Sequence, residues 1–193
     1  DLQRNQLVDG VVRNLVAKVQ PSSLSNEQAL QVVSEEITIP EVSYFDGVLM
    51  GLMALGIKKG QHVGIWATNY PEWVLAQFAT AKIGAVLVTV NPSYRTHELE
   101  YVLKQSEADA LILIGQFRNS DYVDMANQVI PELKNSEPGE LYCRNLPNLR
   151  NVVFIPMPSD RKAKAPDGMW SWEDVRQKAG EVSGEDLSKR QES

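Results

Sequence analysis

The feature that most constrains the fold is an alternation of apolar strands and helices between residues 61 and 155. Residues 63–103, VGIWATNYPEWVLAQFATAKIGAVLVTVNPSYRTHELEYVL, have the pattern strand, turn, helix, strand, turn, helix. Two more strands are predicted at ADALILIG and NVVFI, with a helix over residues 121–134 between them. Strands that alternate with helices of this length form a parallel sheet through right-handed crossovers. The sequence therefore predicts an α/β fold, a mostly parallel sheet with flanking helices.

Polar residues mark where the two central helices should begin. In ATNYPEW, Asn69 can cap a helix, Pro71 suits its first turn, and Glu72 completes a capping box. In NPSYRTHELE, Thr96 is the expected N-cap. The strand between these helices, AVLVTV, shows no polar alternation, so we expect both of its faces to be buried.

The chain divides into three stretches. Residues 1–60 form a helical and irregular segment that leads into the sheet, with a helix over residues 7–19, a strand at ALQVVS and an apolar stripe that stops at Gly56. Residues 61–155 form a βαβαβαβ core. Residues 156–193 are a loop, a short helix capped by Ser171, and a polar, mobile tail.

Composition excludes several classes of partner and site. The net charge of −6 argues against nucleic acid, and no apolar run reaches the ~18–20 residues that cross a bilayer. The first residues carry no signal-peptide pattern. Cys143 is the one cysteine, so an intrachain disulfide is excluded and a cytoplasmic location is expected. Neither His62 nor His97 stands in a metal-ligand pattern with Cys143.

The sequence contains no complete catalytic motif. A parallel α/β sheet binds ligands at the carboxyl ends of its strands, which here carry ATNYPE, NPSYRT and IGQFRNSD. There is no G-x-G-x-x-G turn, no G-x-x-x-x-G-K-[ST] loop and no G-x-S-x-G elbow. Cys143 has no histidine near it in sequence and is interpreted as a structural thiol. We therefore assign no catalytic, cofactor-binding or metal residue.

Three features at these strand ends allow both a structural and a functional interpretation. Asn69 could contact a ligand, but a helix cap accounts for it. Tyr94 and Arg95 could meet an anion, but a turn whose arginine pairs with a nearby carboxylate is the simpler reading. Trp66 and Trp73 could line a pocket for an apolar tail, although aromatic residues beside a buried helix usually belong to the core. The structural interpretation is favoured for all three.

The amino-acid sequence of residues 52–113 resembles that of a known protein family. The segments ALGIKKGQHVGI, N-x-PEW, A-x-x-G-A, NP-x-YR-x-x-EL and L-x-x-S-x-A together are similar to the N-terminal part of the adenylate-forming acyl-CoA synthetases. That superfamily also includes 4-coumarate ligases, firefly luciferase and peptide-synthetase adenylation domains. The stretch NPSYRTHELEYVLKQS most resembles the fatty-acyl-CoA synthetases. Before residue 50 the likeness is weak, because TIPEVSYFDGV replaces the family's usual T-Y-x-E-L.

The resemblance implies a reaction for the intact enzyme. A fatty acid and ATP, with Mg²⁺, would form an acyl-adenylate and diphosphate, and coenzyme A would then displace AMP. The family's phosphate loop, ribose-binding acid and catalytic lysine all lie downstream of the matched region. We therefore expect this chain to be the N-terminal fragment of such a ligase, to hold none of these cofactors alone and to be inactive alone. Its implied roles are one wall of the acyl pocket and a contact in a homodimer.

Two alternatives stay open at this point. The chain could be a non-catalytic α/β module that binds a partner or a small molecule. It could also be the corresponding part of an enzyme that adenylates an aryl or amino acid, because the family's selectivity residues lie later in the chain. An isolated subdomain of this kind should also expose apolar surface and self-associate.

Overall fold

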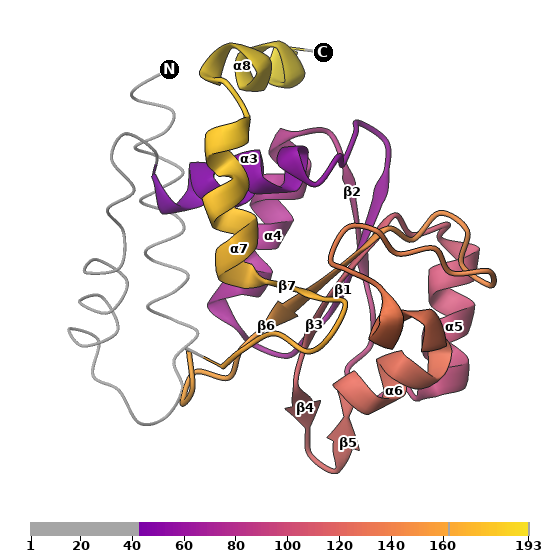
Figure 1. Cartoon of the computed structure of the whole chain (residues 1–193). Helices are drawn as coiled ribbons and strands as arrows, with labels where there is room; N and C mark the ends of the chain where they lie inside the picture. Colours follow the sequence, from indigo (N-terminus) through magenta and orange to yellow (C-terminus); the bar gives the residue numbers. More distant parts are fainter. Residues whose placement is uncertain (1–42, 162, 193) are drawn as a thin grey trace.

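The computed structural model describes residues 43–161 and 163–192, and its centre is a five-stranded parallel sheet (Figure 1). The helix predicted over residues 7–19 and the strand predicted at ALQVVS lie outside the described residues. The sheet has the order β2-β1-β3-β6-β7. Its strands are β1 (His62–Trp66), β2 (Val86–Thr89), β3 (Ala110–Ile114), β6 (Asn151–Ile155) and β7 (Trp170–Ser171). The predicted parallel α/β core is confirmed.

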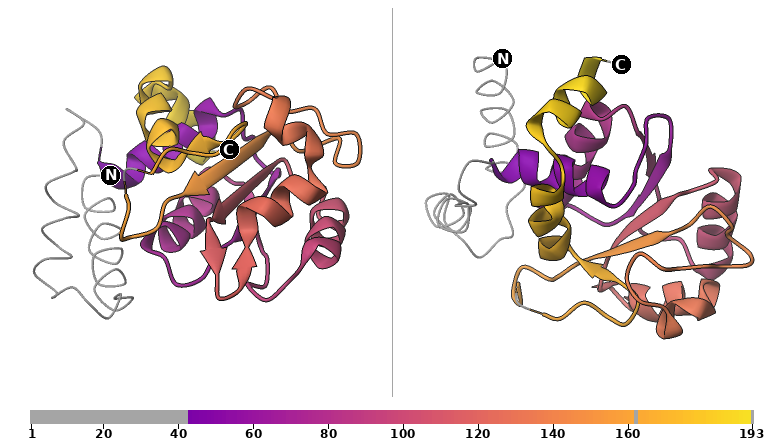
Figure 2. Two further views of the ribbon diagram at one scale, coloured as in Figure 1. Left: turned by 60° about the horizontal axis from the view of Figure 1, so that its bottom comes forward. Right: turned by 45° about the horizontal axis from the view of Figure 1, so that its top comes forward.

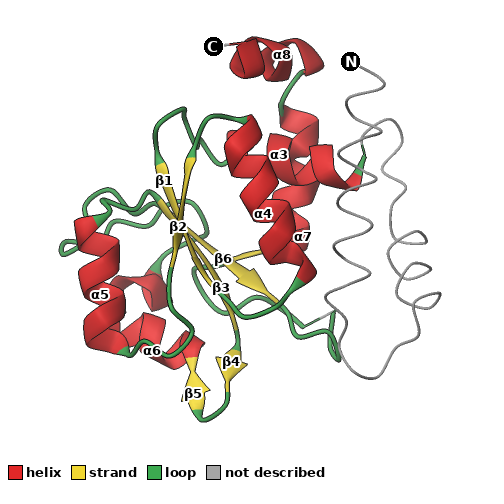
Figure 3. Ribbon diagram, turned by 180° about the vertical axis from the view of Figure 1, so that it is seen from behind, coloured by secondary structure: helices red, strands yellow, loops and turns green. Residues whose placement is uncertain are grey.

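Helices cover both faces of the sheet. The helices are α3 (Tyr44–Ala54), α4 (Pro71–Lys82), α5 (Thr96–Gln105), α6 (Tyr122–Val129), α7 (Trp172–Gln177) and α8 (Gly184–Glu192), with 3₁₀ turns η1 (Pro131–Asn135) and η2 (Lys178–Glu181). Helices α3, α4 and α7 lie on one face, and α5 and α6 lie on the other (Figures 2 and 3). A small antiparallel hairpin, β4 (Gln116–Phe117) and β5 (Ser120–Asp121), joins β3 to α6.

The centre of the sheet is the core of the molecule. Every residue of β3 and β6 is buried, and the two strands pair in register from Ala110 opposite Asn151 to Ile114 opposite Ile155. Two-sided burial explains why these strands are apolar throughout except at Asn151, whose side-chain amide donates to the Leu55 carbonyl and accepts from the Trp170 indole N–H. No helix among the described residues is long and apolar enough to cross a membrane.

The prediction for β2 was wrong. AVLVTV was expected to be buried on both faces, but β2 is an edge strand whose first and last residues are exposed, with Val86 at 44%. The chain runs from β1 to β2 on one side and then returns past β1 to place β3, β6 and β7 on the other. A strand's apolar run therefore did not distinguish the middle of the sheet from its edge.

Two predicted helix caps were also wrong. Tyr70, in extended conformation and without a side-chain bond, precedes α4 in place of Asn69. Arg95 occupies the N-cap of α5, and its backbone N–H donates to Glu98 at 3.0 Å, so Thr96 is the first helical residue. Both shifts are by one residue, and the predicted helices are present.

The C-terminal half shows the remaining agreements and differences. Ser171 caps α7 as predicted, because its Oγ accepts from the Asp174 N–H at 3.0 Å. The helix predicted over 121–134 ends at Val129, since Pro131 lacks the N–H that would continue it and starts a 3₁₀ turn instead. The two-residue strand β7 was not predicted. Residues 184–192, predicted as part of a polar tail, form α8 with no buried residue.

Candidate functional site

The first candidate site is the carboxyl end of the sheet, where the order reverses between β1 and β3. Sheets of this topology bind ligands in that crevice. Here two aromatic side chains lie in it: Trp66 at the end of β1 stacks on Tyr122 at the start of α6, with ring centroids 3.7 Å apart and planes 6° apart. Both are fully buried. The Trp66 side chain is therefore core, as the sequence favoured.

Hydrogen bonds hold the Trp66–Tyr122 pair against the segment that follows β2. The Trp66 indole N–H donates to the Asn91 carbonyl at 3.1 Å, and the Tyr122 hydroxyl donates to the Pro92 carbonyl at 2.5 Å. Asn91 and Pro92 lie two and three residues beyond the end of β2. The pair thus joins the ends of β1 and β2 to α6, and it fills the position where a ligand would approach.

Replacing Tyr122 with phenylalanine tests this contact. We expect a loss of about 1 kcal/mol at neutral pH, since the variant removes one buried hydrogen bond. Burial raises the pKa of Tyr122 to about 12. Its contribution to stability is therefore complete below the unfolded pKa of about 10 and is lost as the pH rises toward 12. Urea unfolding between pH 8 and 11.5 should show a shallower alkaline loss for Tyr122→Phe than for the parent chain.

A residual alkaline loss is expected in that variant, because burial also raises the pKa of Tyr44 and Tyr70. Identical pH profiles for the two proteins would contradict the assigned role of Tyr122.

The other residues considered in the sequence do not assemble into a reactive group. Asn69 and Arg95 are exposed, and Trp73 packs against the core. Cys143 is buried, and this burial raises the pKa of its thiol, which favours the protonated and unreactive form. Within residues 43–161 and 163–192, no cluster of His, Cys, Asp and Glu could hold a metal ion.

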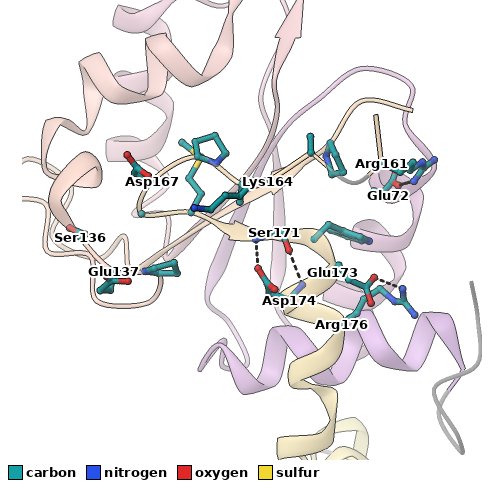
Figure 4. A pocket seen from close by; sticks show the side chains of 18 of the residues that line it. Glu72, Ser136, Glu137, Arg161, Lys164, Asp167, Ser171, Glu173, Asp174 and Arg176 are labelled. Atoms are coloured by element: carbon teal, nitrogen blue, oxygen red, sulfur yellow. Dashed lines mark hydrogen bonds and ion pairs between the residues drawn. The ribbon is translucent and has the colours of Figure 1, made fainter. Parts of the chain in front are cut away.

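The second candidate site is a cleft of about 1050 Å³ beside β7. Its walls come from the first turns of α3, α4 and α7, from the loop between β6 and β7, and from the end of η1 (Figure 4). Ten of the side chains that line it are labelled in Figure 4: Glu72, Ser136, Glu137, Arg161, Lys164, Asp167, Ser171, Glu173, Asp174 and Arg176.

A buried carboxylate, that of Glu72, lines this cleft. Glu72, in the first turn of α4, is only 2% exposed, and its Oε1 forms an ion pair with Arg161 of the loop between β6 and β7. Its Oε2 has no partner among the described residues. The sequence assigned Glu72 to a capping box and missed this pair, because Arg161 is 89 residues away. A glutamate on the covered side of a helix was the one available signal.

A second buried charge, Arg176, lines the same cleft. Arg176 of α7 pairs with Glu173 at 2.6 Å, and its guanidinium stacks 3.8 Å from the ring centre of Tyr44. The Trp172 indole N–H donates to the Tyr44 hydroxyl at 3.2 Å. Burial, and then the nearby Glu72 charge, raise the pKa of Tyr44, so this phenol stays neutral. These contacts attach α7 and the loop to α3 and α4.

Comparison with known proteins identifies the family of this chain. A family model described as AMP-binding enzyme matches residues 48–171. The chain belongs to the AMP-binding enzyme family. The matched region contains the whole parallel sheet, both aromatic residues of the filled crevice and the Glu72–Arg161 pair.

Individual relatives of this chain have names that agree with the family. It is 47% identical over 143 residues to the protein named "Putative acyl-CoA synthetase YngI" of Bacillus subtilis (strain 168), covering 74% of this chain and 25% of that protein. It is 38% identical over 134 residues to the mitochondrial medium-chain acyl-CoA ligase ACSF2 of Homo sapiens, covering 68% and 22%. The chain thus spans about a quarter of the length of these curated relatives.

Solved structures with a similar fold include an acetoacetyl-CoA synthetase from Streptomyces lividans, with a TM-score of 0.52 and 25% identity over 69% of this chain and 19% of that one. The anthranilate CoA ligase AuaEII in complex with anthranoyl-AMP has a TM-score of 0.54 and 21% identity, and covers 86% and 27%. The likeness to the second structure concerns the fold alone.

The cleft beside β7 does not fit the triphosphate of ATP. Both arginines that line it are already paired with glutamates, and the lining carboxylates outnumber the cations. The lining carboxylates are Glu72, Glu137, Asp167, Glu173 and Asp174, and the lining cations are Lys134, Arg161, Lys164 and Arg176. A buried carboxylate with a free oxygen repels phosphate. At both candidate sites, the contacts among the described residues join elements of the fold to one another.

Proposed function

We propose that this chain is the first α/β unit of an acyl-CoA ligase that joins a fatty acid to coenzyme A with ATP and Mg²⁺. The acid would first react with ATP to give an acyl-adenylate and diphosphate, and the thiol of coenzyme A would then release AMP. The family match over residues 48–171 carries this proposal. The names of the relatives, an acyl-CoA synthetase and a medium-chain acyl-CoA ligase, support the substrate class.

In this proposal the chain contributes structure and no chemistry. The strand-end crevice is filled by Trp66 and Tyr122, and the cleft beside β7 is lined by paired charges and by an excess of carboxylates. In the cleft, both arginines are already paired with glutamates, which leaves Lys134 and Lys164 facing an excess of carboxylates. We therefore propose that ATP, Mg²⁺ and coenzyme A bind residues outside these 193, and that this chain alone is inactive.

The sharpest test begins with the natural coding sequence. If it continues past Ser193 into a Ser/Thr/Gly-rich loop that ends in lysine, the whole encoded protein should form acyl-CoA from ATP, coenzyme A and an acid. A stop codon at that point would contradict the ligase proposal and favour a binding module. ATP–diphosphate exchange by the purified 193-residue chain, at a rate near that of the whole protein, would contradict the assignment of scaffold alone.

The class of acid substrate is tested by assaying the whole protein with a panel of carboxylic acids. Saturated acids of eight, twelve and sixteen carbons are compared with benzoate, anthranilate and two amino acids. We expect turnover with at least one fatty acid to exceed that with every aryl and amino acid. The opposite ranking would leave the AMP-forming ligase intact and overturn the fatty-acid assignment.

Two further properties belong to the same proposal. A cytoplasmic location is supported by the lone, buried Cys143, and fluorescence imaging of a tagged protein checks it. A homodimer is supported by a sheet edge that the described residues leave open.

A further inference from the structure

The cleft beside β7 contains an unpaired hydrogen-bond acceptor and an unpaired donor, both on buried side chains. Glu72 is 2% exposed and Arg176 is 3% exposed, and both side chains line the cleft. Among the described residues, the Oε2 of Glu72 receives no hydrogen bond and the Nε–H of Arg176 donates none. Buried polar groups are normally paired, and leaving one unpaired is costly. These two atoms therefore mark a place where a bound molecule can supply the missing partners.

Both unpaired groups lie near Tyr44. The guanidinium of Arg176 is 3.8 Å from the centre of the Tyr44 ring. Burial, and after it the charge of Glu72, raise the pKa of the same phenol, which places the Glu72 carboxylate close to it. In Figure 4, Glu72 and Arg176 lie at the same end of the cleft, away from Ser136 and Glu137. The two unpaired atoms thus belong to one end of the cleft.

The charges at this end of the cleft are already balanced. Glu72 forms an ion pair with Arg161, and Arg176 forms one with Glu173 at 2.6 Å. A bound anion would face the Glu72 carboxylate, and a bound cation would face Arg161 and Arg176. An additional charge without a partner of its own is unfavourable in a buried site. The balance therefore favours a neutral ligand that brings one donor and one acceptor.

A carboxamide carries a donor and an acceptor on separate atoms of one plane. Its NH₂ group can donate to the Oε2 of Glu72 while its carbonyl oxygen accepts from the Nε–H of Arg176. The rest of the cleft suits an apolar body attached to that group, because Pro166, Met169 and Trp172 also line it. Its volume of about 1050 Å³ is at the upper end of the range for small-molecule sites.

We infer that the cleft beside β7 binds an uncharged molecule that presents a carboxamide to Glu72 and Arg176, with its apolar part against Trp172 and Pro166. This site is separate from the strand-end crevice, which Trp66 and Tyr122 fill. The inference rests on the contacts of the cleft and is independent of the ligase proposed above. Its failure would leave that proposal unchanged.

Three compounds with the same ring separate the carboxamide from charge. Benzamide is the neutral amide, benzoate the anion and benzamidine the cation. Binding to the full 193-residue chain is followed by NMR through the Trp172 indole N–H, which donates to the Tyr44 hydroxyl at 3.2 Å. We expect benzamide to shift this signal and to bind at least about fivefold more tightly than the other two compounds. The Trp66 indole N–H, which donates to the Asn91 carbonyl at 3.1 Å, should not shift.

A variant that removes one charge should reverse this order. Glu72→Gln replaces the unpaired acceptor with an NH₂ donor, and its remaining oxygen can still accept from Arg161. Two donors then face the ligand, so benzoate should bind at least about threefold more tightly than benzamide. Glu137→Gln is the matched control, because it removes the same charge from an exposed side chain at the other end of the cleft. The control should keep the order of the parent chain.

The outcomes that overturn the inference are specific. It fails if none of the three compounds shifts the Trp172 signal, because water alone would then satisfy the two unpaired atoms. It also fails if benzoate or benzamidine binds the parent chain as tightly as benzamide does. These two results need no variant, so they hold even if Glu72→Gln does not fold. A Glu72→Gln chain with the circular dichroism spectrum of the parent that still prefers benzamide would overturn the assignment as well.

Discussion

Replacing Gly51 with alanine is expected to lower the free energy of unfolding by about 3 kcal/mol, the upper part of the range for overpacking a core. A Cβ at this position would lie 2.0 Å from the backbone oxygen of Val175 and 2.7 Å from its carbonyl carbon. These are backbone atoms, so relief requires α7 to move away from α3. Urea unfolding at neutral pH measures the loss.

A glycine in the 3₁₀ turn that follows α7 provides a matched control. Gly180 lies in η2, which also packs against α3, and a Cβ there would meet nothing within 4 Å. Gly180→Ala should change stability by less than about 0.5 kcal/mol. Equal effects of the two substitutions would mean that α3 and α7 do not pack as closely as described. A selective effect at Gly51 would confirm that this contact holds the helix layer that forms one wall of the cleft beside β7.

The sequence predicted the parts of this fold that depend on local pattern. Strands β1, β3 and β6 and helices α4 and α5 were predicted from the apolar pattern, and Ser171 was predicted as the cap of α7. Features that depend on how the strands are arranged in the sheet were not predicted from the sequence. The edge position of β2 follows from the direction of the crossovers, and the two residues of β7 are too few to show a period.

The candidate site shows the same limit. Trp66 was placed in the core because aromatic residues beside a buried helix usually belong there, but its stacking on Tyr122 joins residues 56 positions apart. No local sequence pattern predicts a contact between residues so far apart in the chain. Glu72 was given a cap role because its spacing from Asn69 fitted one, whereas the folded chain offers it Arg161. A long-range ion pair replaced a local hydrogen bond because α4 turns that side chain toward the loop between β6 and β7.

That pair carries the second large expected effect. Arg161→Ala should lower the free energy of unfolding by about 2 kcal/mol, because it leaves the Glu72 carboxylate buried without its partner. The fully buried case costs more, but the Arg161 side chain is 34% exposed and solvent screens part of the interaction. Glu72→Gln removes the charge that needs a partner. In a Glu72→Gln background, Arg161→Ala should therefore cost no more than about 0.5 kcal/mol.

A surface pair in the same chain shows what burial contributes. Lys104 pairs with Glu100 at 2.6 Å across one turn of α5, with side chains 49% and 35% exposed. Its double-mutant cycle should give a coupling of about 0.3–0.5 kcal/mol that falls in 0.5 M salt. The Glu72–Arg161 cycle should give a coupling at least threefold larger and less sensitive to salt. Equal couplings would indicate that solvent reaches Glu72, and the cleft beside β7 would then be more open at its base than its contacts imply.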